Sequence, residues 1–416
     1  MNRTLIAIAI LLVAAVGGAA LFLFPYNPLQ PPKADDTGST PEGIQEVVNA
    51  NNKVAFELYQ QLSGEEGNIF FSPYSISSAL AITYEGARGK TAEEIKNVFH
   101  FPDYDTLRPN FAAIYNEINK GHGDYMLRTG NALWVQKDFP LLENYTTTVE
   151  RYYGAKAANL DFANEPEKSR QTINSFIEKQ TEGKIKDLIP PGFIDPSTRL
   201  VITNAVYFKG TWKFEFDPKE TQKMDFHVNS NKTIKVQMMH MKPKEKMFNY
   251  AETEDVQILE LPYKGDDISM LIILPKLGKL SEVEKNLTLE KLEEWKSKMK
   301  RTELSDIYLP KFEFETKYFL KDTLARMGMP TAFSPSADFS GMTGRRDLFI
   351  SHVIHQAYVK VDEKGAEAAA ATGVILRKSI PAPEIIFKAD HPFIFIIQQK
   401  STGNILFIGR IVEPKI

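Results

Sequence analysis

The sequence predicts one large domain of the α+β class, and three observations lead to this prediction. The first third of the chain carries helix-like patterns, the later part carries runs rich in β-branched and aromatic residues, and no internal repeat is visible. Helices that come first and strands that follow favour an α+β architecture over alternating βα units. After residue 43, no second linker rich in proline and glycine interrupts the chain. We therefore expect one domain rather than two.

The first 24 residues predict a signal peptide or a membrane anchor. Asn2-Arg3 precedes an uncharged apolar run of twenty residues from Leu5 to Phe24, about the length of a helix that crosses a bilayer. Gly18-Ala19-Ala20 would suit a signal peptidase, whereas the length of the run favours an uncleaved anchor. In either case we expect the rest of the chain to be extracytoplasmic, anchored to the membrane or secreted.

Residues 25–43 predict an extended, solvated linker, and residues 44–416 predict the folded domain. The linker contains Thr, Ser, Asp and Gly together with five prolines: Pro25, Pro28, Pro31, Pro32 and Pro41. The domain should begin near Ile44.

Four segments predict helices. Val47 to Leu62 is partly amphipathic, and Ser75 to Glu85 is small and apolar enough to be buried. Thr91 to Glu94 reads as a capping box that opens a helix toward Phe99. Leu287 to Lys300 is a highly charged amphipathic helix. Strands are predicted where β-branched and aromatic residues are dense, at residues 199–208, 256–261, 268–274 and 393–397.

The composition excludes several classes of function. The chain has no cysteine, which excludes disulfides, thiolate catalysis and cysteine-ligated metals. Its formal net charge is -3 and its Lys and Arg residues are scattered, so nucleic acid is not expected as a partner.

The enzyme-like motifs lack the context that their chemistry needs. Gly86 and Gly89 stand too close together for a phosphate-binding loop, and Ser297-x-x-Lys300 has none of the supporting elements of an acyl-enzyme. His352-x-x-His355 has no third ligand nearby in the sequence. We therefore predict no catalytic residue, no metal and no cofactor.

Several blocks of sequence resemble the serpin family of serine protease inhibitors, in the family's order. These blocks are residues 68–80 (NIFFSPYSISSAL), 204–212 (NAVYFKGTW), 260–264 (ELPYK), 338–341 (DFSG) and 389–395 (ADHPFIF). The resemblance covers roughly Ile44 to Pro414. It implies three β-sheets, about eight or nine helices, an exposed reactive-centre loop near the C-terminus, and a largest sheet that can accept one more strand.

The resemblance also assigns roles to single residues. Ser72, Ser75, Asn204 and His355 look like the hydrogen-bonded cluster behind the opening sheet, where buried polar groups must be paired while the strands are together. Helix capping by the serines and a satisfied core histidine is the simpler alternative. Trp212 resembles the tryptophan beneath the point where insertion begins; by itself it would be read as a core residue.

The segment that begins at Glu363 resembles the hinge of inhibitory serpins, although an alanine run usually predicts helix. Ala366 stands where many members carry threonine, and both side chains are small and uncharged. The hinge residues are Glu363, Gly365, Ala366, Glu367, Ala368, Ala369, Ala370, Ala371 and Thr372.

Strand geometry accounts for the small side chains. Alternate residues of a strand face opposite sides, and proline would delete a ladder hydrogen bond. The face that would be buried after insertion has no charge, and no proline occurs before Pro381; its members are Ala366, Ala368, Ala370, Thr372, Val374 and Leu376. Fourteen residues from Ala366 to Ser379, at about 3.3 Å each, could carry an attached protease about 45 Å.

The resemblance implies an irreversible suicide-substrate inhibitor that acts as a monomer, with serine proteases as its partners. Three bonds compete as the cleaved one. The family's spacing favours Ser379-Ile380, the Ser-Ile-Pro sequence favours Lys378-Ser379, and Arg377-Lys378 is a third choice. Basic residues before the bond suit trypsin-like proteases, whereas Ser379 suits elastase-like or subtilisin-like ones.

A non-inhibitory serpin, acting as a carrier or a chaperone, is the alternative function. Hinges of such proteins commonly contain proline or an inward-facing charge. This hinge has neither.

Overall fold

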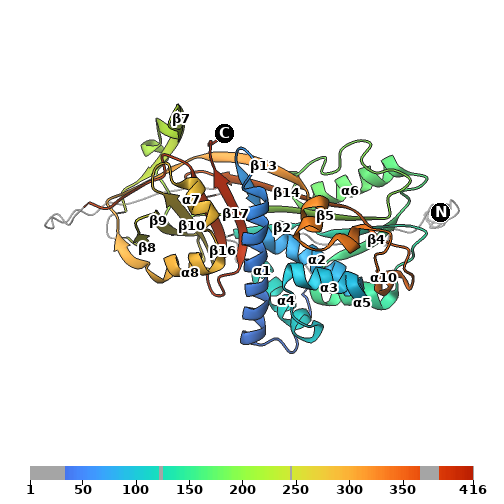
Figure 1. Cartoon of the computed structure of the whole chain (residues 1–416). Coiled ribbons are helices and arrows are strands. Elements are labelled where there is room, and N and C mark those ends of the chain that lie inside the picture. The colour runs from blue at the N-terminus through green and yellow to red at the C-terminus, as the bar shows by residue number, and fades with distance from the viewer. Residues whose placement is uncertain (1–32, 121–124, 244–245, 366–383, 416) are drawn as a thin grey trace, which may run out of the picture. The chain divides into compact units, whose positions relative to one another are not determined.

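The computed structural model describes residues 33–120, 125–243, 246–365 and 384–415 (Figure 1). These residues form three β-sheets, ten α-helices and two short 3-10 helices. The three sheets and the α+β class confirm the predicted architecture. The helix number exceeds the expected eight or nine because it includes helices as short as the four-residue α10 (Ser340–Thr343).

The six-stranded sheet runs in the order β13-β14-β5-β3-β4, with β2 also paired to β5. Its two central strands, β14 and β5, are parallel neighbours, and the strand outside each of them is antiparallel to it. The strands are β2 (Tyr125–Thr129), β3 (Ala132–Gln136), β4 (Lys156–Leu160), β5 (Leu200–Gly210), β13 (Phe312–Phe319) and β14 (Ile350–Val361).

The seven-stranded sheet is antiparallel throughout, in the order β1-β17-β16-β10-β9-β8-β11. Every residue of β10, β16 and β17 is buried, which explains why these strands read as continuous apolar runs. Its strands are β1 (Ile69–Phe71), β8 (Met247–Glu252), β9 (Val256–Pro262), β10 (Ile268–Pro275), β11 (Lys300–Glu303), β16 (Phe393–Gln399) and β17 (Ile405–Ile411).

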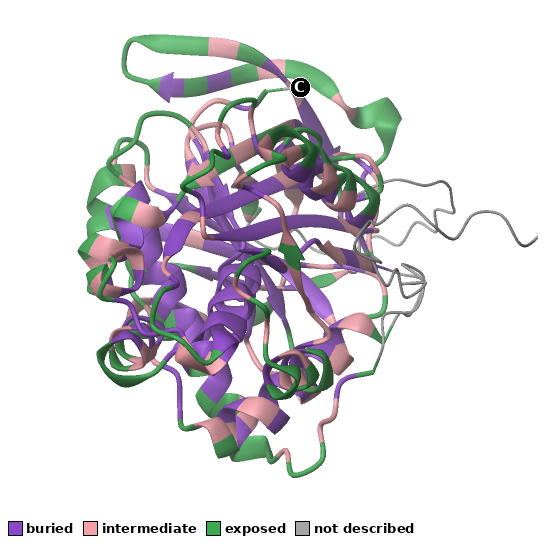
Figure 2. Ribbon diagram, turned by 90° about the vertical axis from the view of Figure 1, so that its right-hand side faces the viewer, coloured by how far each residue is buried: buried purple, intermediate pink, exposed green. Residues whose placement is uncertain are grey.

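The four-stranded sheet runs in the order β15-β12-β7-β6. The β6–β7 ribbon extends away from the other strands with much of its surface exposed, as the upper edge of Figure 2 shows. Its strands are β6 (Gln222–Asn229), β7 (Lys232–Met241), β12 (Asp306–Pro310) and β15 (Ile386–Lys388).

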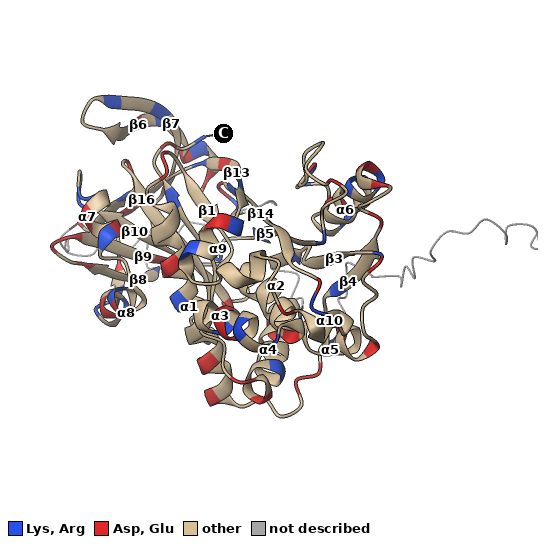
Figure 3. Ribbon diagram, turned by 45° about the vertical axis from the view of Figure 1, so that its right-hand side comes forward, with Lys and Arg blue, Asp and Glu red and all other residues tan. Residues whose placement is uncertain are grey.

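Helix α2 (Pro73–Gly86) is buried over all 14 residues and packs against β5 and β17, so it lies between two sheets. Charged residues of both signs are interspersed over the outer helices (Figure 3). The other helices are α1 (Pro41–Leu62), α3 (Gly89–Phe99), α4 (Tyr104–Asn119), α5 (Glu143–Tyr153), α6 (Pro166–Gln180), α7 (Leu280–Lys285), α8 (Leu289–Ser297), α9 (Lys321–Met327), η1 (Pro218–Glu220) and η2 (Pro330–Phe333).

Residues 33–43, expected as the end of a solvated linker, contact the domain. Ala34 is buried, and the side chain of Asn116 on α4 hydrogen-bonds both its N–H and its carbonyl at 2.9 Å. Asp35 forms an ion pair with Arg151 on α5, and α1 begins at Pro41 behind the capping residue Thr40. The sequence could not show this because the partners lie far along the chain. The expected boundary at Ile44 falls inside α1.

Helix α3 begins at Gly89, earlier than the expected capping box predicts. Thr91 and Glu94 bond elsewhere: Thr91 Oγ1 accepts the N–H of Asp338, and the Glu94 carboxylate accepts the N–H and the hydroxyl of Thr331. These two side chains therefore form tertiary hydrogen bonds in place of the capping bonds that the local sequence pattern predicts.

The described residues contain no helix long and apolar enough to cross a membrane. Residues 5–24, on which the prediction of an anchor or a signal peptide rests, lie outside the described ranges.

Candidate functional site

A cluster of buried polar side chains lies behind the junction of β5 and β14, which we call the seam. Asn204 on β5 and His355 on β14 are direct register partners across this junction. Ser72, the capping residue of α2, donates its N–H to Nε2 of His355 at 3.1 Å and accepts the N–H of Ser75 on its hydroxyl. The structure therefore brings together four residues that the sequence singled out.

Asn204 links this cluster across the seam. Its Oδ1 bonds Nδ1 of His355, and its amide nitrogen donates to the carbonyl and the hydroxyl of Ser75 and to Oδ1 of Asn131, each at 2.6 Å. Because Ser75, Asn204 and His355 are buried, parting the strands must replace these bonds or leave polar groups unpaired.

His355 is held neutral. Burial lowers the pKa of its ring to about 3, and the interaction with Asn204 opposes that shift only in part. The N–H of Ser72 points at Nε2, so Nε2 is the acceptor nitrogen and Nδ1 carries the proton toward Asn204. Among the residues that the structure describes, no carboxylate bonds to the ring that could serve as a counter-ion for a positive charge.

Trp212, just past the end of β5, closes one end of the seam. This residue is 1% exposed, and its ring stacks on Tyr263 with 4.4 Å between the ring centroids. Its indole N–H donates to the carbonyl of Asp362 at 3.0 Å, and its backbone N–H donates to that of Lys364 at 2.8 Å. The chain that leaves β14 is thus bonded to the tryptophan directly beneath it.

Glu363 fixes the start of the predicted hinge. Its carboxylate is nearly buried and accepts hydrogen bonds from Nζ of Lys311 at 2.8 Å and from the hydroxyl of Thr221 at 2.7 Å. Burial raises the pKa of this carboxyl, but the bonds from Lys311 and Thr221 outweigh that effect and leave the pKa below its ordinary value.

Gly365, the last residue described before the loop, can only be glycine. Its φ is +104°, and a Cβ there would lie 2.4 Å from the carbonyl oxygen of Gly210 and 2.5 Å from the backbone nitrogen of Trp212. The backbone can approach the end of β5 this closely only without a side chain.

Comparison with known proteins places this geometry in a family. The family model described as "Serpin (serine protease inhibitor)" matches residues 49–414. The chain belongs to the serpin family. Its relatives include leukocyte elastase inhibitor A of Mus musculus, 41% identical over 381 residues that cover 89% of this chain and 100% of the inhibitor. An uncharacterized serpin-like protein of Thermococcus kodakarensis is 43% identical over 432 residues and covers 100% of both chains.

Solved serpin structures share the fold. Uncleaved ovalbumin superposes with a TM-score of 0.80 at 31% identity, covering 89% of this chain and all of ovalbumin. Human thyroxine-binding globulin gives a TM-score of 0.81 at 30% identity, covering 90% of this chain and all of the globulin.

The other predicted site residues of this serpin lie outside the described residues. They are the hinge residues Ala366, Glu367, Ala368, Ala369, Ala370, Ala371 and Thr372, and the reactive-centre residues Arg377, Lys378, Ser379 and Ile380. The described chain ends at Gly365 beside Trp212 and resumes at residue 384, before β15 in the four-stranded sheet.

Sequence reasoning missed four residues that complete this region of the serpin: Asn131 in the polar cluster, Tyr263 under Trp212, and Lys311 and Thr221 around Glu363. Tyr263 belongs to one of the blocks that carry the resemblance, so that block could have pointed to it. The other three become visible only when distant segments meet.

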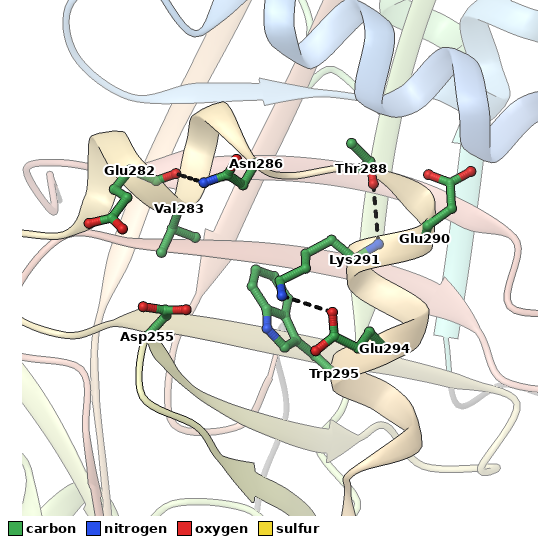
Figure 4. A pocket seen from close by; sticks show the side chains of 9 residues that line it. All are labelled: Asp255, Glu282, Val283, Asn286, Thr288, Glu290, Lys291, Glu294 and Trp295. Atoms are coloured by element: carbon green, nitrogen blue, oxygen red, sulfur yellow. Dashed lines mark hydrogen bonds and ion pairs between the residues drawn. The ribbon is translucent and has the colours of Figure 1, made fainter.

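A pocket of about 380 Å³ lies elsewhere, beside α7 and α8 (Figure 4). Glu282, Glu290 and Glu294 surround it, and Lys291 points toward Glu294 with an ion pair of 2.8 Å. The buried ring of Trp295 forms its floor. Its residues are separate from those of the seam.

Proposed function

We propose that this serpin inhibits serine proteases by presenting residues 366–383 as a bait and then inserting the hinge as a new strand between β5 and β14. The observation that carries the proposal is the seam itself. β14 and β5 are parallel neighbours, and a chain that turns back at Gly365 would run antiparallel to both. Insertion would replace one parallel ladder by two antiparallel ladders, which are the more stable pairing.

The same geometry accounts for a barrier. Eight register pairs join β5 and β14 along the seam, and the cluster of Asn204 and His355 bridges it from behind. These bonds must be exchanged before a new strand can enter. The inserted state can therefore be the more stable one and still be reached slowly.

In the proposed reaction the chemistry belongs to the target. The protease cuts one of the bonds between Arg377 and Ile380 and is held as an acyl-enzyme; the freed hinge then inserts and distorts the active site of the protease before water can release it. In this scheme Ser72, Ser75, Asn204 and His355 control the opening of the seam, and Trp212 lies where insertion begins.

The test is to mix the domain with trypsin, elastase and subtilisin and to look for a complex that survives denaturing electrophoresis. We expect such a complex with at least one of these proteases. The mass of the released C-terminal peptide would identify the cleaved bond among Arg377-Lys378, Lys378-Ser379 and Ser379-Ile380. Plain cleavage of the loop by every protease, without a stable complex, would contradict the proposal.

A carrier or chaperone is the second candidate, favoured by the structural similarity to thyroxine-binding globulin. That outcome would appear as cleavage without complex formation. The hinge argues against it, because its inward positions carry neither proline nor charge.

For location, we propose that the domain acts outside the cytoplasm. The support is the apolar run from Leu5 to Phe24 at the start of the chain. Recovery of the full-length chain from the soluble cytoplasmic fraction would contradict this proposal.

A further inference from the structure

The segment that joins α6 to β5, residues 181–199, crosses the seam on the face opposite α2; we call it the cover segment. Three of its apolar side chains, Ile185, Leu188 and Ile189, are fully buried. They belong to one apolar cluster with Val201 and Ala205 of β5 and Ile354 of β14, together with side chains of β3 and α6. The cover segment therefore packs on both sides of the seam.

Helix α6 fixes the middle of the cover segment. The amide side chain of Asn174 donates to the carbonyl of Ile189 and accepts its N–H, both at 2.9 Å. Arg170 donates to the same carbonyl at 3.0 Å. The part of the cover segment around Ile189 should therefore stay with α6 when the seam opens.

Residues before and after Ile189 in the cover segment contact β13 and β14. Lys317 of β13 donates to the carbonyl of Asp187 at 2.9 Å. The ring of Phe193 lies 4.2 Å from the ring of His352 on β14 and 4.9 Å from that of Phe319, measured between centroids. If the cover segment stays with α6, moving β14 away from β5 must break the contacts that Asp187 and Phe193 make with β13 and β14.

Lys184 lies beside aromatic rings of both seam strands. Tyr207 of β5 and Tyr358 of β14 are register partners whose ring centroids lie 5.8 Å apart. Nζ of Lys184 lies 5.8 Å from each of the two centroids. A cation within about 6 Å of an aromatic ring is attracted to it, and here one cation is shared by rings on opposite sides of the seam.

Opening the seam must disturb this arrangement. An added strand increases the spacing between β5 and β14 by about 4.8 Å and places its own side chains between the two rings. The ammonium group can then no longer lie beside two adjacent rings, because a side chain of the new strand separates them. Tyr358 also donates a hydrogen bond to Glu313 on β13. This bond is the main reason that the pKa of the Glu313 carboxyl is lowered, and Lys360 and the charge of Lys184 lower it further against the opposing effect of burial. Lys184 is therefore also attracted to the strand beyond β14.

We propose that Lys184 is a positioning residue that holds the seam closed by binding Tyr207 and Tyr358 together, and so sets how often β5 and β14 separate. The consequence for inhibition rests on the proposed function: a seam that opens more readily should accept the hinge sooner after cleavage. The opening itself can be measured without any protease.

The experiment is amide hydrogen exchange on the uncleaved protein. Lys184→Gln removes the charge and keeps a side chain of similar length. Because Lys184 is exposed, we expect a moderate effect, with seam amides of β5 and β14 near Tyr207 and Tyr358 exchanging about fivefold faster. Amides of β16 and β17 should be unchanged.

Two variants act as controls. Lys184→Arg keeps a cation that can lie over the rings and should restore the exchange of the wild type. Lys186→Gln removes a neighbouring exposed charge that pairs with Glu178 on α6 at 3.5 Å, and it should leave the seam amides unchanged. Equal exchange in Lys184→Gln and the wild type would overturn the proposal, as would equal acceleration by Lys186→Gln.

A second measurement separates this proposal from the proposed function. With a target protease, Lys184→Gln should consume fewer inhibitor molecules per protease inactivated than the wild type does. If no variant forms a stable complex, the inhibitory function fails, while the exchange result still decides the role of Lys184.

Discussion

Lowering the pH from 7 to 5 should destabilise the native sheet by about 2 kcal/mol through His355 alone. The pKa of this buried ring is about 3 in the folded state, against an ordinary value of 6.5. Between these values the unfolded chain binds a proton that the folded chain does not. The stabilisation is therefore complete above pH 6.5 and is lost progressively as the pH falls toward 3. Each pH unit below 6.5 costs about 1.4 kcal/mol.

The assay is urea unfolding of the uncleaved protein at pH 7, 6 and 5, in the wild type and in His355→Gln. Glutamine can bond Ser72 and Asn204 but does not titrate, so the variant should lose less stability over this range, by about 2 kcal/mol. His352, whose pKa burial also lowers, contributes equally to both proteins and cancels in the comparison.

A direct measurement covers the case in which the variant does not fold. The ring resonances of His355 in the wild type should stay those of a neutral imidazole down to pH 5. A ring that titrates near pH 6.5, or equal pH dependence of stability in the two proteins, would refute the reasoning.

Three further predictions concern the hinge and the N-terminus. Glu363→Gln should lower the free energy of unfolding by about 1–3 kcal/mol, because it leaves Lys311 without its carboxylate; an unchanged urea midpoint would contradict this. Thr372→Arg should raise the number of inhibitor molecules consumed per protease, because a guanidinium would be buried on insertion, whereas Ala371→Arg faces the other way and should raise it less; equal values would refute the register. If residues 5–24 form an anchor, mass spectrometry of membrane-bound protein should find the N-terminal residues intact, and a shortened chain would show cleavage.

The strands and the longer helices could be predicted because their signals are local. The apolar runs at 268–274 and 393–397 correspond to β10 and β16, which are buried along their whole length, and the pattern from Val47 to Leu62 falls within α1. Periodicity and β-branched content reflect burial, and here burial follows them.

What the sequence did not show depends on distant contacts. The start of α3 differs from the predicted one because the expected capping residues bond to distant segments, as Glu94 does with Thr331. Ala34 looked like part of a linker because nothing near it in sequence reveals that Asn116 bonds its backbone.

The candidate site also contains residues that the sequence predicted and a residue that it could not reveal. The resemblance pointed to Ser72, Ser75, Asn204 and His355, and the structure adds how they are bonded and that His355 is neutral. Lys184 carried no signal, because its meaning depends on two tyrosines that are adjacent only once β5 and β14 are paired.

The central claim is that the seam between β5 and β14 accepts the hinge as a strand. Calorimetry of the protein before and after a single cut between Arg377 and Ile380 tests it most directly. The account predicts a sharp rise in the thermal midpoint, because the cut loop can enter the sheet and add two antiparallel ladders. An unchanged or lower midpoint in the cut protein would contradict it.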